Sequence, residues 1–195
     1  MVENSIFPDT QTLMLMKTLL SAFVLLIVLF SCKKDDLLPA ATQNGANTFG
    51  CKVNGKTWIP DGGGGFSGIK PVQGGIGVSP VNPSIYNILI RTYRNNKTKI
   101  DIYIHDIKAV GVYNLNSDVA IWPAQTEPLR NYGAYFPDPG QAFVTNPEYT
   151  GTVNITRADT VNRIVSGTFE FTVYNPDSKQ TIRITDGRFD VDSRK

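Results

Sequence analysis

The chain has 195 residues, of which 41% are hydrophobic, so it is long enough to form one domain with a sizeable core. Its formal net charge of +2 excludes the strongly basic balance that is typical of nucleic-acid-binding proteins, and no nucleic-acid partner is expected. After residue 60 the chain is rich in Ile, Val, Thr, Tyr and Phe, and this composition favours β-strands over helices.

An apolar run, TLLSAFVLLIVLF, occupies residues 18–30. Its length suits the apolar region of a signal peptide and falls short of the roughly 20 residues that a membrane-spanning helix needs. We therefore interpret residues 1–31 as a signal peptide. Residues 1–13 contain two acids, which is unusual at the start of such a signal, and we interpret them as a mis-annotated start that precedes Met14 or Met16.

The apolar run ends in Leu29-Phe30-Ser31-Cys32, which resembles a bacterial lipobox, where a small residue precedes a cysteine. The resemblance implies cleavage after Ser31 and a Cys32 that carries diacylglycerol and an amide-linked acyl chain such as palmitate. Two or three acyl chains hold a protein firmly in a membrane, because each buried methylene contributes about 0.8 kcal/mol. The alternative is an ordinary secretory signal with an accidental cysteine.

The charged residues 33–36, KKDD, follow the lipobox directly. They are similar to the short charged run that directs Bacteroidota lipoproteins to the outer face of the cell. The resemblance implies an outer-membrane lipoprotein of the cell envelope, exposed at the surface, whose membrane contact is the lipid anchor.

Residues 32–47 are rich in polar and small residues and show no hydrophobic period, so we interpret them as a flexible lipidated tether. The domain is expected to span residues 48–195. Because Cys32 is expected to carry lipid, Cys51 has no intramolecular partner for a disulfide. We predict that Cys51 is a small apolar residue of an N-terminal strand, and nothing nearby indicates a catalytic thiol.

Alternating apolar residues predict at least six strands joined by short turns. Asn54-Gly55 and Asn95-Asn96 are typical of tight hairpin turns. A change of parity before Phe189 predicts a bulge or bend at Asp186-Gly187. We therefore predict an all-β fold, a single antiparallel β-sandwich or flattened barrel. The expected strands cover residues 48–53, 56–60, 84–93, 97–107, 149–156, 163–175 and 180–185, and Phe189 and Val191 continue the alternation of the last one.

The strand at residues 97–107 alternates clearly. Ile100, Ile102 and Ile104 are expected to face the core. Asp101, Tyr103 and His105 then lie on the opposite face, which is expected to contact solvent.

The C-terminal segment, residues 148–192, contains the strands SGTFEF and TDGRFDV. It resembles a recurrent pattern in small uncharacterised Bacteroidota lipoproteins, a family of unknown function. The resemblance implies an exported β-rich domain and supplies no known activity.

The sequence contains no recognisable catalytic or metal-binding set, and no cofactor is expected. His105 is the single histidine, and Asp101 on the same strand face lies about 13 Å away. Asp190 and Asp192 share a strand face and are candidates for a calcium site, but without a calcium-loop motif we expect them to be solvated charges. The glycines of residues 63–68 match G-x-G-x-x-G, yet Pro71 follows instead of a helix, so we expect a mobile loop.

The segment from Ile121 to Tyr149 is rich in aromatic residues and prolines and is expected to be irregular. Long irregular segments in compact domains are often functional, and aromatic loops suit sugar or protein recognition. The alternative is that these rings cap the open end of the sandwich. The residues proposed as a binding surface are Trp122, Tyr132, Tyr135, Phe136 and Phe143.

The tripeptide Asp159-Thr160-Val161 is similar to the sequence at which Bacteroidota attach O-linked glycans to exported proteins. Thr160 is expected in an accessible turn between two strands, and the resemblance implies that it is an O-glycosylation candidate.

Together these features favour a lipid-anchored envelope protein that binds a ligand or has a structural role, rather than an enzyme. A glycan, a peptide and an outer-membrane protein all remain candidate partners. Two alternatives stay open: an envelope hydrolase that uses two carboxylates, and a lipocalin-like carrier of an apolar ligand.

Overall fold

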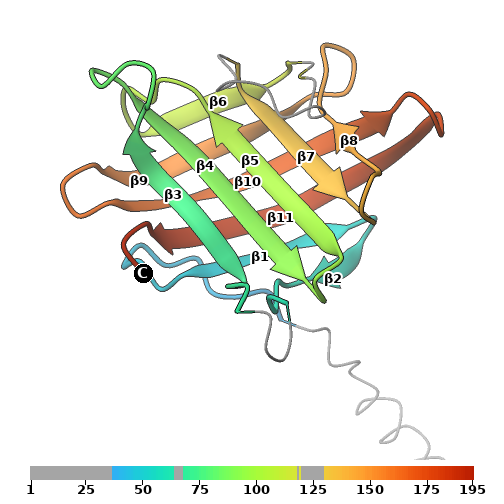
Figure 1. Ribbon diagram of the computed structural model, residues 1–195, viewed down its shortest axis with the longest axis horizontal. Helices are drawn as coiled ribbons and strands as arrows, with labels where there is room; N and C mark the ends of the chain where they lie inside the picture. Colours follow the sequence, from blue (N-terminus) through green and yellow to red (C-terminus); the bar gives the residue numbers. More distant parts are fainter. Residues whose placement is uncertain (1–36, 64–67, 118, 120–129) are drawn as a thin grey trace, which may run out of the picture. The chain divides into compact units, whose positions relative to one another are not determined.

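The computed structural model describes residues 37–63, 68–117, 119 and 130–195. The described residues form one compact unit, and residues 1–36 lie outside the described part. The described residues contain strands and no helix, so no helix among them is able to cross a membrane (Figure 1). The strands are β1 (Thr48–Val53), β2 (Lys56–Trp58), β3 (Val72–Val78), β4 (Tyr86–Arg94), β5 (Thr98–Ile104), β6 (Gly111–Leu115), β7 (Tyr132–Phe136), β8 (Phe143–Val144), β9 (Gly151–Asp159), β10 (Ile164–Asn175) and β11 (Gln180–Asp192).

All strand pairs are antiparallel, and nine strands follow the order β2-β1-β11-β10-β8-β7-β5-β4-β3. β10 also pairs with β9, which pairs with β6, so the sheet divides at this long strand. The sheet curls into a half-barrel in which β3, β4, β5 and β7 cross in front of β9, β10 and β11 (Figure 1). At the free edge of β3, the Ser193 hydroxyl donates a 3.0 Å hydrogen bond to the Ile76 carbonyl. The prediction of an all-β antiparallel domain is confirmed.

The inner face of the curled sheet holds the main hydrophobic core. Phe169 lies at its centre, with ring centroids 5.0 Å from Phe49 and 6.2 Å from Phe189. The predicted inward side chains of β5, Ile100, Ile102 and Ile104, are fully buried. Aromatic and β-branched side chains therefore fill the space between the two halves of the sheet.

Two hairpin turns have the predicted geometry. Asn54 and Gly55 have φ angles of 48° and 78°, and Asn95 and Asn96 have φ angles of 52° and 54°. Positive φ at both central residues matches the twist of the flanking strands, and Asn and Gly adopt it at low cost. The turn residues therefore set the β1–β2 and β4–β5 hairpins.

The predicted bulge near Asp186 is confirmed. The register of β11 shifts against β10 between Phe169 and Phe171, and against β1 between Gly50 and Lys52. Asp186 has a φ of 54°, so the extra residue sits in the left-handed region. The bulge reverses the inward parity of β11, which returns Phe189 to the core.

The expectation that residues 121–149 are irregular is wrong for part of this segment. β7 and β8 lie within it and pair with each other, and β7 also pairs with β5. Every residue of β7, YGAYF, is buried, so the strand shows no alternation of polar and apolar residues. A strand covered on both faces gives no period-two signal.

The expectation of a solvated outer face on β5 is also wrong. Asp101 and Tyr103 are 2% and 4% exposed, because a second hydrophobic cluster covers this face. Tyr103 stacks on Tyr132 with ring centroids 5.7 Å apart. Asp101 pairs with Lys99 at 3.0 Å and Arg91 at 3.4 Å. Burial raises the pKa of Asp101, although the two cations act in the opposite direction.

Residues 37–47, here called the N-terminal segment, have no regular secondary structure and lie against the domain. The Asp190 carboxylate accepts hydrogen bonds from the Thr42 hydroxyl and from the backbone N–H groups of residues 44–46. The Lys195 ammonium donates to the Gly45 carbonyl at 3.0 Å. This part of the expected flexible tether is therefore bound to the end of β11.

Candidate functional site

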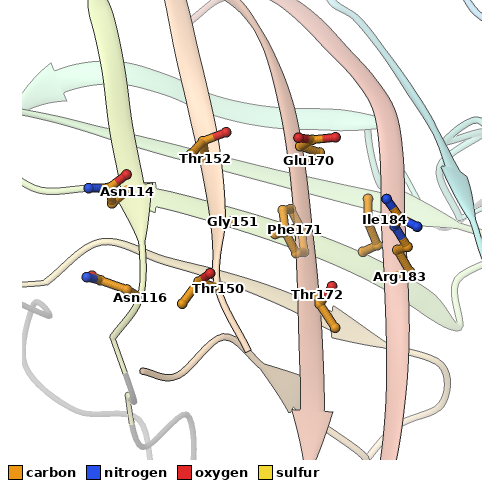
Figure 2. A pocket seen from close by; sticks show the side chains of 10 residues that line it. All are labelled: Asn114, Asn116, Thr150, Gly151, Thr152, Glu170, Phe171, Thr172, Arg183 and Ile184. Carbon is orange, nitrogen blue, oxygen red and sulfur yellow. The ribbon is translucent and has the colours of Figure 1, made fainter. Parts of the chain in front are cut away.

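A polar groove of about 480 Å³ crosses the outer face of β6, β9, β10 and β11 (Figure 2). It forms there because the strands alternate: Val153, Phe169, Phe171 and Val173 are buried in the core, whereas Thr152, Glu170 and Thr172 lie on the outer face. Its volume falls within the range of small-molecule sites. The lining residues are Asn114, Asn116, Thr150, Gly151, Thr152, Glu170, Phe171, Thr172, Arg183 and Ile184.

The strand register aligns these polar residues in rows across the sheet. Thr152 pairs with Asn114 on one side and with Glu170 on the other. Thr172 pairs with Arg183. Directly opposed residues have Cβ atoms roughly 5 Å apart, and four strands span about 14 Å. The groove therefore presents a continuous array of amide, hydroxyl, carboxylate and guanidinium groups.

The polar side chains of this array make no hydrogen bond or ion pair with other described residues. Glu170 and Arg183 make no ion pair within the part of the chain that the structure describes. Elsewhere on β11, by contrast, Asp186 pairs with Lys52 at 3.2 Å. The hydrogen-bonding capacity of Glu170 and Arg183 is available to a ligand.

Gly151 shapes the floor of the groove. A Cβ atom at this position would overlap the Phe171 Cβ and the Glu170 carbonyl oxygen on the neighbouring strand. Only glycine permits this close approach of β9 to β10.

Two stacked tyrosines flank one end of the groove. The rings of Tyr149 and Tyr174 have centroids 4.8 Å apart and planes 12° apart. Tyr149 directly precedes Thr150, and Tyr174 lies two residues beyond Thr172 on the same face of β10. An aromatic surface therefore adjoins the polar array.

Four of the five aromatic residues proposed as a binding surface are described by the structure, and all four are buried. Tyr132 and Phe136 belong to the outer hydrophobic cluster, whereas Tyr135 and Phe143 belong to the main core. These four side chains are at most 8% exposed. Trp122 lies outside the described residues. The four described rings fit the alternative that these rings are packing residues.

Asp190 and Asp192 are not solvated charges, contrary to the expectation. Both are buried, and both are occupied by hydrogen-bond donors of the chain itself. Asp190 binds the N-terminal segment and the Ser166 hydroxyl, and Asp192 binds the Arg194 guanidinium at 2.9 Å. Burial acts to raise the pKa of Asp190, but its five hydrogen bonds outweigh this and lower it.

Other candidate residues lie away from the groove. His105 is half-buried just after β5, and its backbone N–H donates to the Asn131 side chain at 2.8 Å. No group of three or more metal-ligating side chains occurs among the described residues. Cys32 lies outside them. Cys51 has a free thiol that is fully buried in β1, as predicted, and burial raises the pKa of this thiol.

Thr160 lies in the turn between β9 and β10, as predicted, and is half-buried. The neighbouring Val161 is 87% exposed. The Asp159 carboxylate accepts hydrogen bonds from the Asn162 backbone and from Arg157, both at 2.8 Å. Bonds from Asn162 and Arg157 lower the pKa of Asp159. The carboxylate thus fixes the conformation of the turn that presents Thr160.

Sequence reasoning did not identify the groove, although part of its signal was visible. The alternation of β10 placed Glu170 and Thr172 on the outer face. Asn114 lies on a strand that was not predicted, and the position of Arg183 opposite Thr172 depends on the register of β11. Pairing between strands, rather than any local motif, assembles the site.

The comparisons with known proteins identify a family without an activity. A family model described as "Domain of unknown function (DUF6252)" matches residues 84–191. The match includes β4 to β10, most of β11 and every lining residue of the groove. No curated protein and no solved structure matches the chain. Because the match extends over more than half of its length, the chain belongs to the DUF6252 family.

Proposed function

We propose that the protein is a lipid-anchored binding module of the cell envelope. Acylated Cys32 holds it in the outer membrane with the domain at the cell surface, and the polar groove binds the ligand. The lipobox-like segment that ends at Cys32 supports the anchor, and the charged residues 33–36 support the surface location.

The observation that carries the binding role is the set of polar side chains in the groove that have no partner among the described residues. A folded sheet satisfies its backbone polar groups within its ladders, so the groups that remain are those of the outer side chains. Glu170, Arg183 and the neighbouring amide and hydroxyl groups converge on one hollow of about 480 Å³. Convergent, uncommitted polar groups in a concave surface are the usual mark of a ligand site.

The groove fits the two alternative functions less well. Glycoside hydrolysis ordinarily needs two carboxylates that flank the scissile bond, and Glu170 is the single carboxylate among the described lining residues. A lipocalin-like carrier needs an apolar cavity, whereas the groove is polar and side chains pack the space inside the curled sheet. Recognition without catalysis is the function that the groove supports best.

The anchor is tested by metabolic labelling with an alkyne analogue of palmitate. The wild-type protein and a Cys51→Ser variant are expected to incorporate the label and to fractionate with the outer membrane. Cys32→Ser is expected to lose both properties. An unlabelled wild-type protein contradicts the anchor. Protease treatment of intact cells checks the surface location, and full protection of the wild type contradicts it.

The binding role is tested by capture from a detergent extract of envelopes. Full-length wild-type protein is compared with Arg183→Ala, Thr172→Val and the control Thr168→Val, which alters the same face of β10 outside the groove. Captured material, analysed for both sugar and peptide, is expected to fall in the two groove variants and to persist in the control. Equal capture by all four proteins contradicts a role for the groove.

The turn at Thr160 supports a second, separate proposal, O-glycosylation of this residue. The intact mass of the native protein is expected to exceed that of its mature polypeptide and lipid by a glycan, and Thr160→Ala is expected to remove the difference. An unmodified native mass contradicts the proposal.

A further inference from the structure

We infer that the ligand of the groove is a neutral, extended saccharide; this inference rests on the proposed binding function. The groove offers donors and acceptors side by side: Arg183 only donates, Glu170 only accepts, and the Thr and Asn side chains do both. A sugar hydroxyl is likewise both a donor and an acceptor, so a run of hydroxyl groups is able to use every member of this array.

The charges of the groove disfavour anionic ligands. A phosphate or carboxylate is best held by donors alone, and the Glu170 carboxylate would repel it. One carboxylate and one guanidinium give the described lining residues no net charge. A neutral ligand meets neither repulsion nor the cost of an unpaired buried charge.

The position of the groove disfavours recognition of a peptide backbone. An added peptide strand needs an open sheet edge, but the groove lies on the face of the sheet. The ladders of β10 with β9 and β11 occupy the backbone groups beneath it. Side chains therefore provide the recognition.

The form of the groove suits a chain of rings. The array extends about 14 Å across four strands, which suits an extended ligand better than one ring. The stacked pair of Tyr149 and Tyr174 at the end of the array offers an aromatic face to the apolar side of a sugar ring. The tyrosine pair therefore adds an aromatic contact beside the polar rows.

The inference is tested with an array of neutral and acidic oligosaccharides. Full-length protein is applied in a detergent without a sugar headgroup, so that the detergent does not compete. Wild type and the control Thr168→Val are expected to bind neutral oligosaccharides. Glu170→Gln is expected to bind about tenfold more weakly, and Thr172→Val about three- to tenfold more weakly, as loss of a charged and a neutral hydrogen bond predicts.

The outcomes separate this inference from the proposed function. Neutral glycan binding that falls in both groove variants supports the inference. Binding of acidic glycans alone, of no glycan, or binding unchanged in the groove variants overturns it. If envelope capture still depends on Arg183 and Thr172 in that case, the groove is a binding site for another class of ligand. If capture is also unaffected, the proposed function fails as well.

Discussion

The Thr42 hydroxyl donates a 2.7 Å hydrogen bond to the carboxylate of Asp190, which lies 148 positions further along the chain. The same carboxylate accepts the Ser166 hydroxyl at 2.7 Å and the backbone N–H groups of residues 44–46 at 2.9–3.1 Å. One buried acid thus fastens the N-terminal segment to β10 and β11. In a lipid-anchored protein, this is where the tether would meet the domain.

Asp190→Asn is expected to lower the free energy of unfolding by about 2–3 kcal/mol, because an amide replaces a charged acceptor that faces five donors. Urea denaturation measures the effect. The matched control is Asp186→Asn on the same strand, which loses an exposed ion pair with Lys52 and keeps a residue type that tolerates its positive φ. This control is expected to lose less than about 0.5 kcal/mol of unfolding free energy. Equal losses in the two variants contradict the role of Asp190 in holding the N-terminal segment.

The pH dependence of stability follows from the same carboxylate. Hydrogen bonds lower the pKa of Asp190 in the folded state, so the unfolded chain binds more protons at acid pH. The resulting stability is complete above the usual Asp pKa of about 3.9 and is lost as the pH falls through the folded pKa. Wild type is expected to lose stability from about pH 4 downward, and Asp190→Asn is expected to lose less.

Asp101 is a control for this pH dependence, because its pKa is shifted in the opposite direction. Burial raises the pKa of Asp101, so its contribution is complete below the usual Asp pKa and is lost as the pH rises through the folded value. Relative to wild type, Asp101→Asn is expected to gain stability as the pH increases above about 4. Unfolding in urea at several pH values measures both trends, and the same pH profile in the two variants contradicts them.

Gly151→Ala is expected to destabilise the domain by about 1–3 kcal/mol, because the added Cβ overlaps Phe171 and the Glu170 carbonyl. Gly77→Ala is the matched control, since a Cβ there meets no atom of the described residues within 4 Å. Its effect is expected to stay within about 0.5 kcal/mol. Thermal unfolding compares the two variants. A Gly151→Ala protein as stable as Gly77→Ala would show that β9 and β10 do not approach so closely.

The features that the sequence predicted correctly are local. Asn54-Gly55 and Asn95-Asn96 specify their turns through their own backbone preferences. The parity change before Phe189 reveals the bulge because one strand carries both registers. In each case a few neighbouring residues contain the whole signal.

The features that the sequence did not predict depend on residues distant in the chain or on burial of both faces of a strand. β7 was not predicted, because all five of its residues are buried and no polar residue alternates with them. From the sequence alone Asp190 resembles a surface acid, because its partner Thr42 lies 148 positions away in the chain. The groove depends on the register that places Thr152 between Asn114 and Glu170. None of these relationships is contained in one segment of sequence.

The Cys51 thiol is expected to be unreactive toward a disulfide reagent such as DTNB while the protein is folded. The side chain is fully buried in β1, so the reagent does not reach the sulfur. Burial also raises the pKa of the thiol, so the reactive thiolate does not form at neutral pH. In a Cys32→Ser background, which leaves Cys51 as the single thiol of the chain, labelling is expected to appear only with denaturant. The denaturant concentration at the midpoint of labelling is expected to coincide with that at the midpoint of unfolding. Rapid labelling under native conditions would contradict the packing of β1 between β2 and β11.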